Sequence, residues 1–148
     1  MPTRTAHTLW TGTLERGQGV VEVDSDSPDY VTVAGRLADD ADGMAGPEEF
    51  LAASHSSCYA IHLAWMITQA GGTPTTLGVR VDITLGSDPE GGLRVVRSAI
   101  TLRGGAEGLT DERFRELAEG ARSDCVISKA LGGRVEITLD VETGSVTV

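Results

Sequence analysis

The chain of 148 residues is long enough for one domain with its own core, and too short for two ordinary domains. Hydrophobic residues make up 40% and charged residues 23%, which is typical of a soluble globular protein, and the net charge of -10 argues against a nucleic-acid partner or an anionic membrane surface. No segment has the roughly 18 apolar residues of a membrane helix, and the N-terminal sequence shows no apolar signal segment. We therefore expect a cytoplasmic protein with a single domain over residues 1–148.

The first third of the chain is predicted to be extended. Short runs rich in Val and Thr are separated by Gly, Ser and Pro, which is the pattern of strands joined by turns. The predicted strands cover 8–14, 19–24 and 30–34. A loop with three aspartates and two glycines follows over 39–46.

A long helix is predicted over 47–70. Pro47 with two glutamates behind it marks the start of a helix, and a pair of glycines after residue 70 marks its end. Apolar residues occupy most of the circumference, and small Ala and Ser residues are frequent between 52 and 64. Such a helix is expected to be buried nearly all round. Because one small sheet covers only one side of it, we infer an obligate homodimer with two such helices side by side.

The second half of the chain contains both strands and helices. Strands are predicted over 79–85, 93–102 and 135–141, where apolar and polar residues alternate as in an antiparallel sheet with one wet face. Helices are predicted over 110–121, capped by Thr110, and over 125–131. About six strands and three helices, grouped by type, indicate the α+β class.

The two cysteines are the first candidates for chemistry. Cys58 lies midway along the long helix, and the ordinary interpretation of such a residue is a buried thiol that packs as a small hydrophobe. Cys125 is expected to open a short helix, where backbone amides and the helix dipole lower the pKa of a thiol.

Two further kinds of site remain open on the residues alone. His55, Cys58 and His62 lie on one helix face, but about 10 Å of helix rise separates the two histidines, which is too far for both to bind one zinc ion. A Cys-His hydrolase is the other alternative, with either histidine as the base. A cysteine in mid-helix, however, lacks free amides for an oxyanion hole.

A resemblance to a known family rests on several motifs. The run GPEEFLAASHSSCYAIHLAWMITQAG resembles the central helix of the OsmC/Ohr family of bacterial peroxidases, and SDCVISKAL resembles its second cysteine segment. The segments LWTGTLERGQGVVEVDS and YVTVAGRLADD resemble the OsmC branch, whose arginine lies shortly before the central helix, here at Arg36. Val126 departs from the pattern, because many relatives have proline there.

The resemblance implies a site and a reaction. Cys58 would attack an organic hydroperoxide, and less efficiently hydrogen peroxide, and Cys125 would resolve the sulfenic acid as a disulfide. Arg36 would hold the attacking thiolate, and Glu48 would fix the arginine. The implied partners are the hydroperoxide and an external thiol or dihydrolipoyl reductant, with no cofactor and no metal. The implied fold has antiparallel sheets wrapped around long central helices in an intertwined homodimer.

Helix geometry indicates that each site is shared between two chains. Glu48 and Cys58 are ten residues apart, which corresponds to about 15 Å of rise. Glu48, and Arg36 before it, would then reach Cys58 of a second copy, unless the helix starts later than Pro47 and Glu48 folds back on its own chain. The competing functions are a non-catalytic stress or ligand-binding protein on the same fold, and the Cys-His hydrolase.

Overall fold

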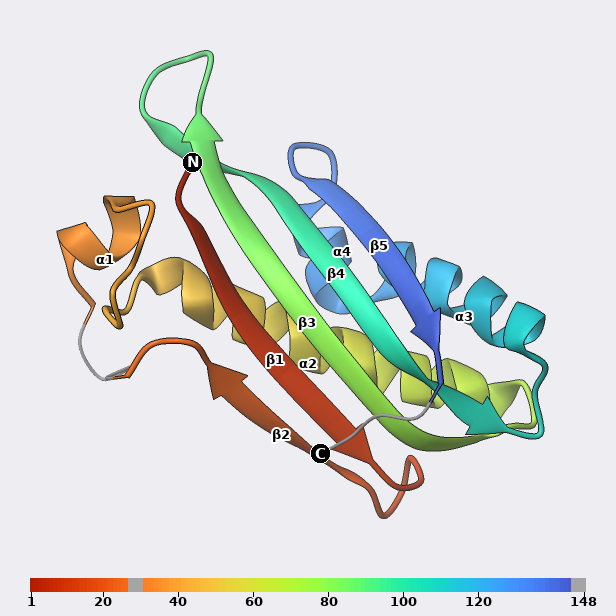
Figure 1. Cartoon of the computed structure of the whole chain (residues 1–148). Coiled ribbons are helices and arrows are strands. Elements are labelled where there is room, and N and C mark those ends of the chain that lie inside the picture. Colours follow the sequence, from red (N-terminus) through yellow and green to blue (C-terminus); the bar gives the residue numbers. More distant parts are fainter. Residues whose placement is uncertain (27–30, 145–148) are drawn as a thin grey trace.

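The computed structural model describes residues 1–26 and 31–144. In chain order the elements are β1 (Thr3–Thr11), β2 (Gln18–Val23), α1 (Val33–Leu37), α2 (Pro47–Gln69), β3 (Thr73–Ser87), β4 (Leu93–Glu107), α3 (Asp111–Asp124), α4 (Val126–Leu131) and β5 (Glu136–Thr143). The strands form one sheet in the order β2-β1-β3-β4-β5, and α2, α3 and α4 lie along one face of it (Figure 1). The predicted α+β class is confirmed.

The sheet is mixed rather than antiparallel throughout. The pairs β1·β2, β1·β3 and β3·β4 are antiparallel, as the alternating patterns predict. The last strand, β5, is parallel to β4. The chain between these two strands forms α3 and α4 and returns along the helical face, which is the crossover that a parallel pair requires.

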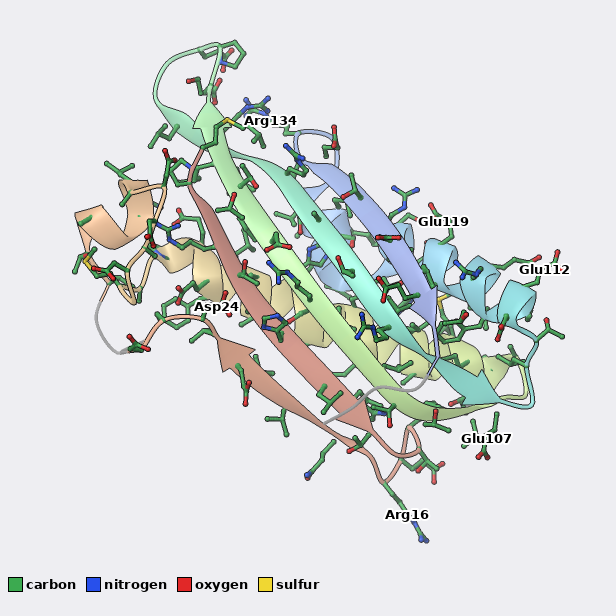
Figure 2. The ribbon with its side chains drawn as sticks, in the orientation of Figure 1. Arg16, Asp24, Glu107, Glu112, Glu119 and Arg134 are labelled. Carbon is green, nitrogen blue, oxygen red and sulfur yellow. The ribbon has the colours of Figure 1, made fainter. Side chains whose placement is uncertain are left out.

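The core lies between the sheet and two helices, α2 and α3. Every second residue of β3 from Leu77 to Ile83 is buried, which matches the predicted alternation. Helix α3 buries Phe114, Leu117, Ala118 and Ala121. Acidic residues such as Glu112 and Glu119 of α3 are exposed, and Figure 2 shows both at the periphery of the molecule. No helix among the described residues is long and apolar enough to cross a membrane.

The predicted strand over 30–34 is wrong for its last two residues, which belong to α1, whereas its first, Tyr30, lies outside the described residues. The hydroxyl of Thr32 caps α1 by accepting a hydrogen bond from the Gly35 N–H at 2.8 Å. The Arg4 side chain of β1 donates to the carbonyl of Gly35 at 2.6 Å and so fixes this turn. These tertiary contacts override the local preference of Val and Thr for strands.

The strand boundaries differ from the predictions mainly by extension. Strand β1 begins at Thr3 rather than at residue 8, and β3 and β4 each cover 15 residues because they pair along almost their whole length. The turn between them covers residues 88–92. In the short-helix region Cys125 is the N-cap, and the helix itself begins at Val126.

Helix α2 is not buried all round within one chain. It spans almost the predicted range and begins at Pro47, but Phe50, Ile61 and Trp65 are 46%, 52% and 48% exposed. These three residues lie within about 60° of one another around the helix axis, at 100° per residue. The sheet and α3 therefore cover one side of α2, and an apolar face remains open on the other.

Candidate active site

Helix α2 carries Cys58 on the flank of its open face. Two hydroxyl contacts help to fix the helix against the sheet and α3: Ser56 Oγ lies 2.8 Å from Thr8 Oγ1 of β1, and Tyr59 OH donates to the carbonyl of Ala118 at 2.8 Å. Tyr59 is fully buried, whereas Cys58 is half-buried. The thiol of Cys58 is thus held on a rigid element at the edge of the core.

Cys125 lies at the junction of α3 and α4. It is the C-cap of α3 and the N-cap of α4, with extended backbone angles of φ -60° and ψ 142°. Its sulfur accepts hydrogen bonds from the N–H and the hydroxyl of Ser128, both at 3.5 Å. Cys125 itself is fully buried. The sharp turn between the two helices therefore points this thiol inward, toward α2.

The two thiols face each other. The side chains of Cys58 and Cys125 lie close enough for each to shift the pKa of the other, and the backbone N–H groups of Ile127 and Val126 act to lower the pKa of Cys58. Both cysteines are free thiols in this structure. The fold thus brings two thiols that are 67 residues apart in the sequence into each other's neighbourhood.

The two thiols have opposite pKa shifts. Burial raises the pKa of Cys58, and the neighbouring sulfur of Cys125 adds to the rise. Burial also acts to raise the pKa of Cys125, but hydrogen bonds from His55 and Ser128 outweigh it and lower this pKa to about 6. The pair therefore releases its first proton below the usual range, and the negative charge resides on Cys125.

His55 connects Cys125 to the sheet. The ring is fully buried, with Nδ1 2.6 Å from Ser98 Oγ of β4 and Nε2 2.8 Å from Ser128 Oγ of α4. Ser98 and Ser128 are themselves buried, so a chain of side chains runs from the sheet through α2 to Cys125.

Arg36 and Glu48 form a separate pair. Arg36 Nε and Nη2 both lie 2.8 Å from Glu48 Oε1, and Glu48 is buried in the first turn of α2. Because the helix begins at Pro47, Glu48 lies about 15 Å along the axis from Cys58. The groups that shift the pKa of Cys58 are Ile127, Cys125 and Val126. Within one chain, the predicted site residues therefore form two separate pairs.

The geometry also bears on the two alternative chemistries. Among residues 1–26 and 31–144, no group of three or more His, Cys, Asp or Glu side chains is placed to hold a metal ion. His55 makes its contacts with Ser98, Ser128 and Cys125, and His62 lies against Trp65 with ring centroids 5.7 Å apart.

Comparison with known proteins identifies the family. Residues 39–140 match the family described as OsmC-like protein. This chain belongs to the OsmC-like family. Peroxiredoxin OsmC from Escherichia coli (strain K12) is 26% identical to the chain over 136 residues, which cover 92% of this chain and 93% of that protein. The resemblance stated from the two cysteine motifs is thereby confirmed.

Solved structures share the OsmC-like fold. An organic hydroperoxide resistance protein from Elizabethkingia anophelis superposes with a TM-score of 0.65 at 26% identity, covering 93% of this chain and 96% of that one. The hydroperoxide resistance protein OsmC from Legionella pneumophila gives a TM-score of 0.64 at 21% identity, with 91% and 96% covered. The second likeness concerns the fold alone.

Ser98 and Ser128 also belong to this OsmC-like site, although neither was predicted as a site residue. Ser128 follows Cys125 by three residues, which is the spacing of an N-cap and the amide it accepts from, so the local sequence carried a signal for it. Ser98 is one residue of a long strand, and its contact with His55 spans 43 positions. His55 itself was weighed as a metal ligand or base of Cys58, not as a partner of Cys125.

Proposed function

We propose that the chain is a thiol-dependent peroxidase in which Cys58 reduces an organic hydroperoxide and Cys125 resolves the product. The observation that carries the proposal is the proximity of a half-buried and a fully buried thiol, close enough to shift each other's pKa. The family and the relative named peroxiredoxin support the same reaction class.

Accessibility supports Cys58 as the attacking residue. Its thiolate takes one oxygen from the hydroperoxide: the O–O bond breaks, sulfur is oxidised to sulfenic acid, and the alkoxide leaves and is protonated to an alcohol. Cys125 is the stronger acid of the two but is fully buried, so a hydroperoxide reaches Cys58 first.

The second step joins the two sulfurs. The thiolate of Cys125 attacks the sulfenic sulfur of Cys58, the S–O bond breaks, and the hydroxide leaves and is protonated to water. The product is a Cys58–Cys125 disulfide. The thiolate that this step needs is already favoured by the hydrogen bonds around Cys125. An external thiol or a dihydrolipoyl group then reduces the disulfide by exchange.

The first step requires a positive group, and the described residues that shift the pKa of Cys58 include none. Burial raises the pKa of this thiol, so without help it stays protonated at neutral pH. We infer that a second copy packs on the open face of α2 and supplies Arg36, held by Glu48, to the Cys58 of its partner. Phe50, Ile61 and Trp65 give this face the apolar character that a dimer contact requires.

The surroundings of Cys58 favour organic hydroperoxides over hydrogen peroxide. Ile61 and Trp65 are about half exposed beside it, and Leu51 and Met66 are partly buried on the same helix. An apolar substituent on the hydroperoxide gains free energy when these side chains remove it from water. Hydrogen peroxide has no such group.

The test is the consumption of cumene hydroperoxide with dithiothreitol as the reductant. We expect the wild-type protein to consume it at a rate that Cys58→Ser abolishes, because no other group in the proposed site accepts the oxygen. Cys125→Ser is the matched control: it should retain a first turnover and then accumulate sulfinate on Cys58. Equal rates for wild type and Cys58→Ser would remove the peroxidase proposal.

The same proteins separate the competing functions. A hydrolase would cleave an activated ester and leave the hydroperoxide intact. A non-catalytic ligand-binding protein would do neither. Either result with correctly folded wild-type protein would contradict the proposal.

A further inference from the structure

His55 has a set of contacts that the two oxidative steps do not require. It is fully buried in α2, yet both of its ring nitrogens have hydroxyl partners on other elements. A histidine that served only to fill the core would be replaceable by an apolar side chain. The hydrogen bonds instead run from Ser98 of β4 through His55 of α2 and Ser128 of α4 to the sulfur of Cys125.

The hydrogen-bond directions can be assigned along the chain. The Ser128 hydroxyl donates to Cys125 Sγ, so the oxygen of Ser128 is free to accept from His55 Nε2, which then carries the ring proton. His55 Nδ1 in turn accepts from the hydroxyl of Ser98. Each donor points toward Cys125, and a sulfur that accepts is satisfied best as a thiolate.

We propose that His55 is a positioning residue that acts through Ser128 to make Cys125 the leaving group when the disulfide is reduced, so that the reductant attacks Cys58. The proposal rests on the disulfide of the proposed function. The thiolate of an external reductant forms a bond to Cys58 Sγ, the Cys58–Cys125 bond breaks, and its electron pair leaves on Cys125. A second thiol of the reductant then releases Cys58 by the same exchange.

Access and leaving-group chemistry both direct the attack of the reductant to Cys58. Cys125 is fully buried and Cys58 is half-buried, so an incoming thiol meets Cys58 first. Exchange is faster when the departing sulfur is the better-stabilised thiolate. Three titratable side chains of α2 lie near Cys125, namely His55, Cys58 and Tyr59, and the hydrogen bonds from the N–H and the hydroxyl of Ser128 favour its charged form.

The test starts from protein oxidised with diamide, so it does not depend on peroxidase activity. The oxidised protein is mixed with a limiting amount of glutathione, quenched in acid, and mapped by peptide mass spectrometry. We expect glutathione on Cys58. Glutathione found mainly on Cys125 would overturn the proposal, whereas a failure of the peroxidase assay alone would leave this result standing.

The role of His55 is tested by the rate of this reduction and by the thiolate absorbance near 240 nm of the reduced Cys58→Ser protein. His55→Leu should slow reduction by roughly three- to tenfold and raise the midpoint of the thiolate absorbance by about one pH unit or more. His55→Gln, which keeps an N–H donor near Ser128, should restore most of both. His62→Leu, on the same helix, is the matched control and should change neither.

If His55→Leu does not fold, Ser128→Ala provides the same test. It removes one hydroxyl, leaves the ring of His55 in place, and should shift the rate and the absorbance midpoint in the same direction as His55→Leu. Unchanged values in folded Ser128→Ala protein would overturn the proposal. A purely structural role of His55 would lower stability in its variants without moving the midpoint.

Discussion

Arg36 holds Glu48 by one oxygen only. Both Nε and Nη2 of the arginine lie 2.8 Å from Oε1, while Oε2 of this buried carboxylate has no hydrogen-bond partner among the described residues. The arginine is about half exposed and keeps further N–H donors. The guanidinium of Arg36 is therefore a preformed cationic group, anchored on one side by Glu48 and open on the other, near the start of the helix whose middle carries Cys58.

The first prediction concerns the sharing of this pair between chains. Inactive Cys58→Ser and Arg36→Ala proteins, mixed in equal amounts and allowed to exchange subunits, should regain about a quarter of the wild-type activity. Half of the dimers are then mixed, and each has one site with an intact arginine and an intact cysteine on opposite chains. The measurement is hydroperoxide consumption before and after mixing.

A matched control for this experiment is Arg16→Ala. Figure 2 shows the Arg16 side chain extending away from the turn between β1 and β2, so its loss should leave activity unchanged. If subunits exchange and mixed dimers form without recovery of activity, the site lies within one chain.

The open face of α2 gives a second prediction. Ile61→Glu places a charge in the middle of this face and should convert a dimer into monomers, because burying an unpaired carboxylate costs several kcal/mol. Sedimentation velocity gives the mass, and circular dichroism checks that the fold is kept. Leu93→Glu, at an exposed position of similar size outside the helix, should leave the mass unchanged. An unaffected mass for Ile61→Glu would show that another surface forms the contact.

The lowered pKa of Cys125 predicts a pH dependence of stability. In the unfolded chain this thiol titrates near 9, and in the folded protein near 6. The contribution of Cys125 to the free energy of unfolding is fully present above pH 9, falls as the pH drops from 9 to 6, and is absent below pH 6. Within this range the slope is at most about 1.4 kcal/mol per pH unit. Because the pKa of Cys58 is raised from 9, the titration of Cys58 changes the stability only above about pH 9.

Urea denaturation under reducing conditions measures this effect as a difference between proteins. The free energy of unfolding of wild type relative to Cys125→Ala should rise between pH 6 and pH 9. A flat difference over this range would mean that Cys125 is not a thiolate in the folded protein.

Tyr59 gives a prediction on stability alone. Tyr59→Phe removes the hydroxyl that donates to the carbonyl of Ala118 and should lower the free energy of unfolding by about 1 kcal/mol, without changing the rate of peroxide reduction. Chemical denaturation and the hydroperoxide assay measure the two quantities. A large loss of activity at unchanged stability would give Tyr59 a role that its buried contact does not suggest.

The sequence predicted those elements whose signals are local. The start of α2 follows from Pro47 and the acids behind it, and β3 follows from strict alternation. The sequence signals were insufficient for elements whose structure depends on contacts with residues far away in the chain. The contacts of Arg4 help to fix α1, and the direction of β5 depends on the path of the crossover helices.

For the candidate site, too, local motifs gave predictions and long-range contacts did not. The motifs predict Cys58, Cys125, Arg36 and Glu48 as site residues, and the structure pairs the last two. The position of Cys125 at a helix start predicted its lowered pKa, but the contribution of His55 was not foreseen, because it depends on how His55 meets Ser98 and Ser128 in three dimensions. Sequence alone does not show which of two thiols a buried network reaches.

The most direct test of the account is mass spectrometry of the reduced protein after one equivalent of an organic hydroperoxide. The proposed reaction predicts one product, in which a disulfide joins the peptides of Cys58 and Cys125 and the hydroperoxide has become its alcohol. Intact hydroperoxide with both thiols free, or sulfinate on Cys58 with Cys125 still reduced, would contradict it.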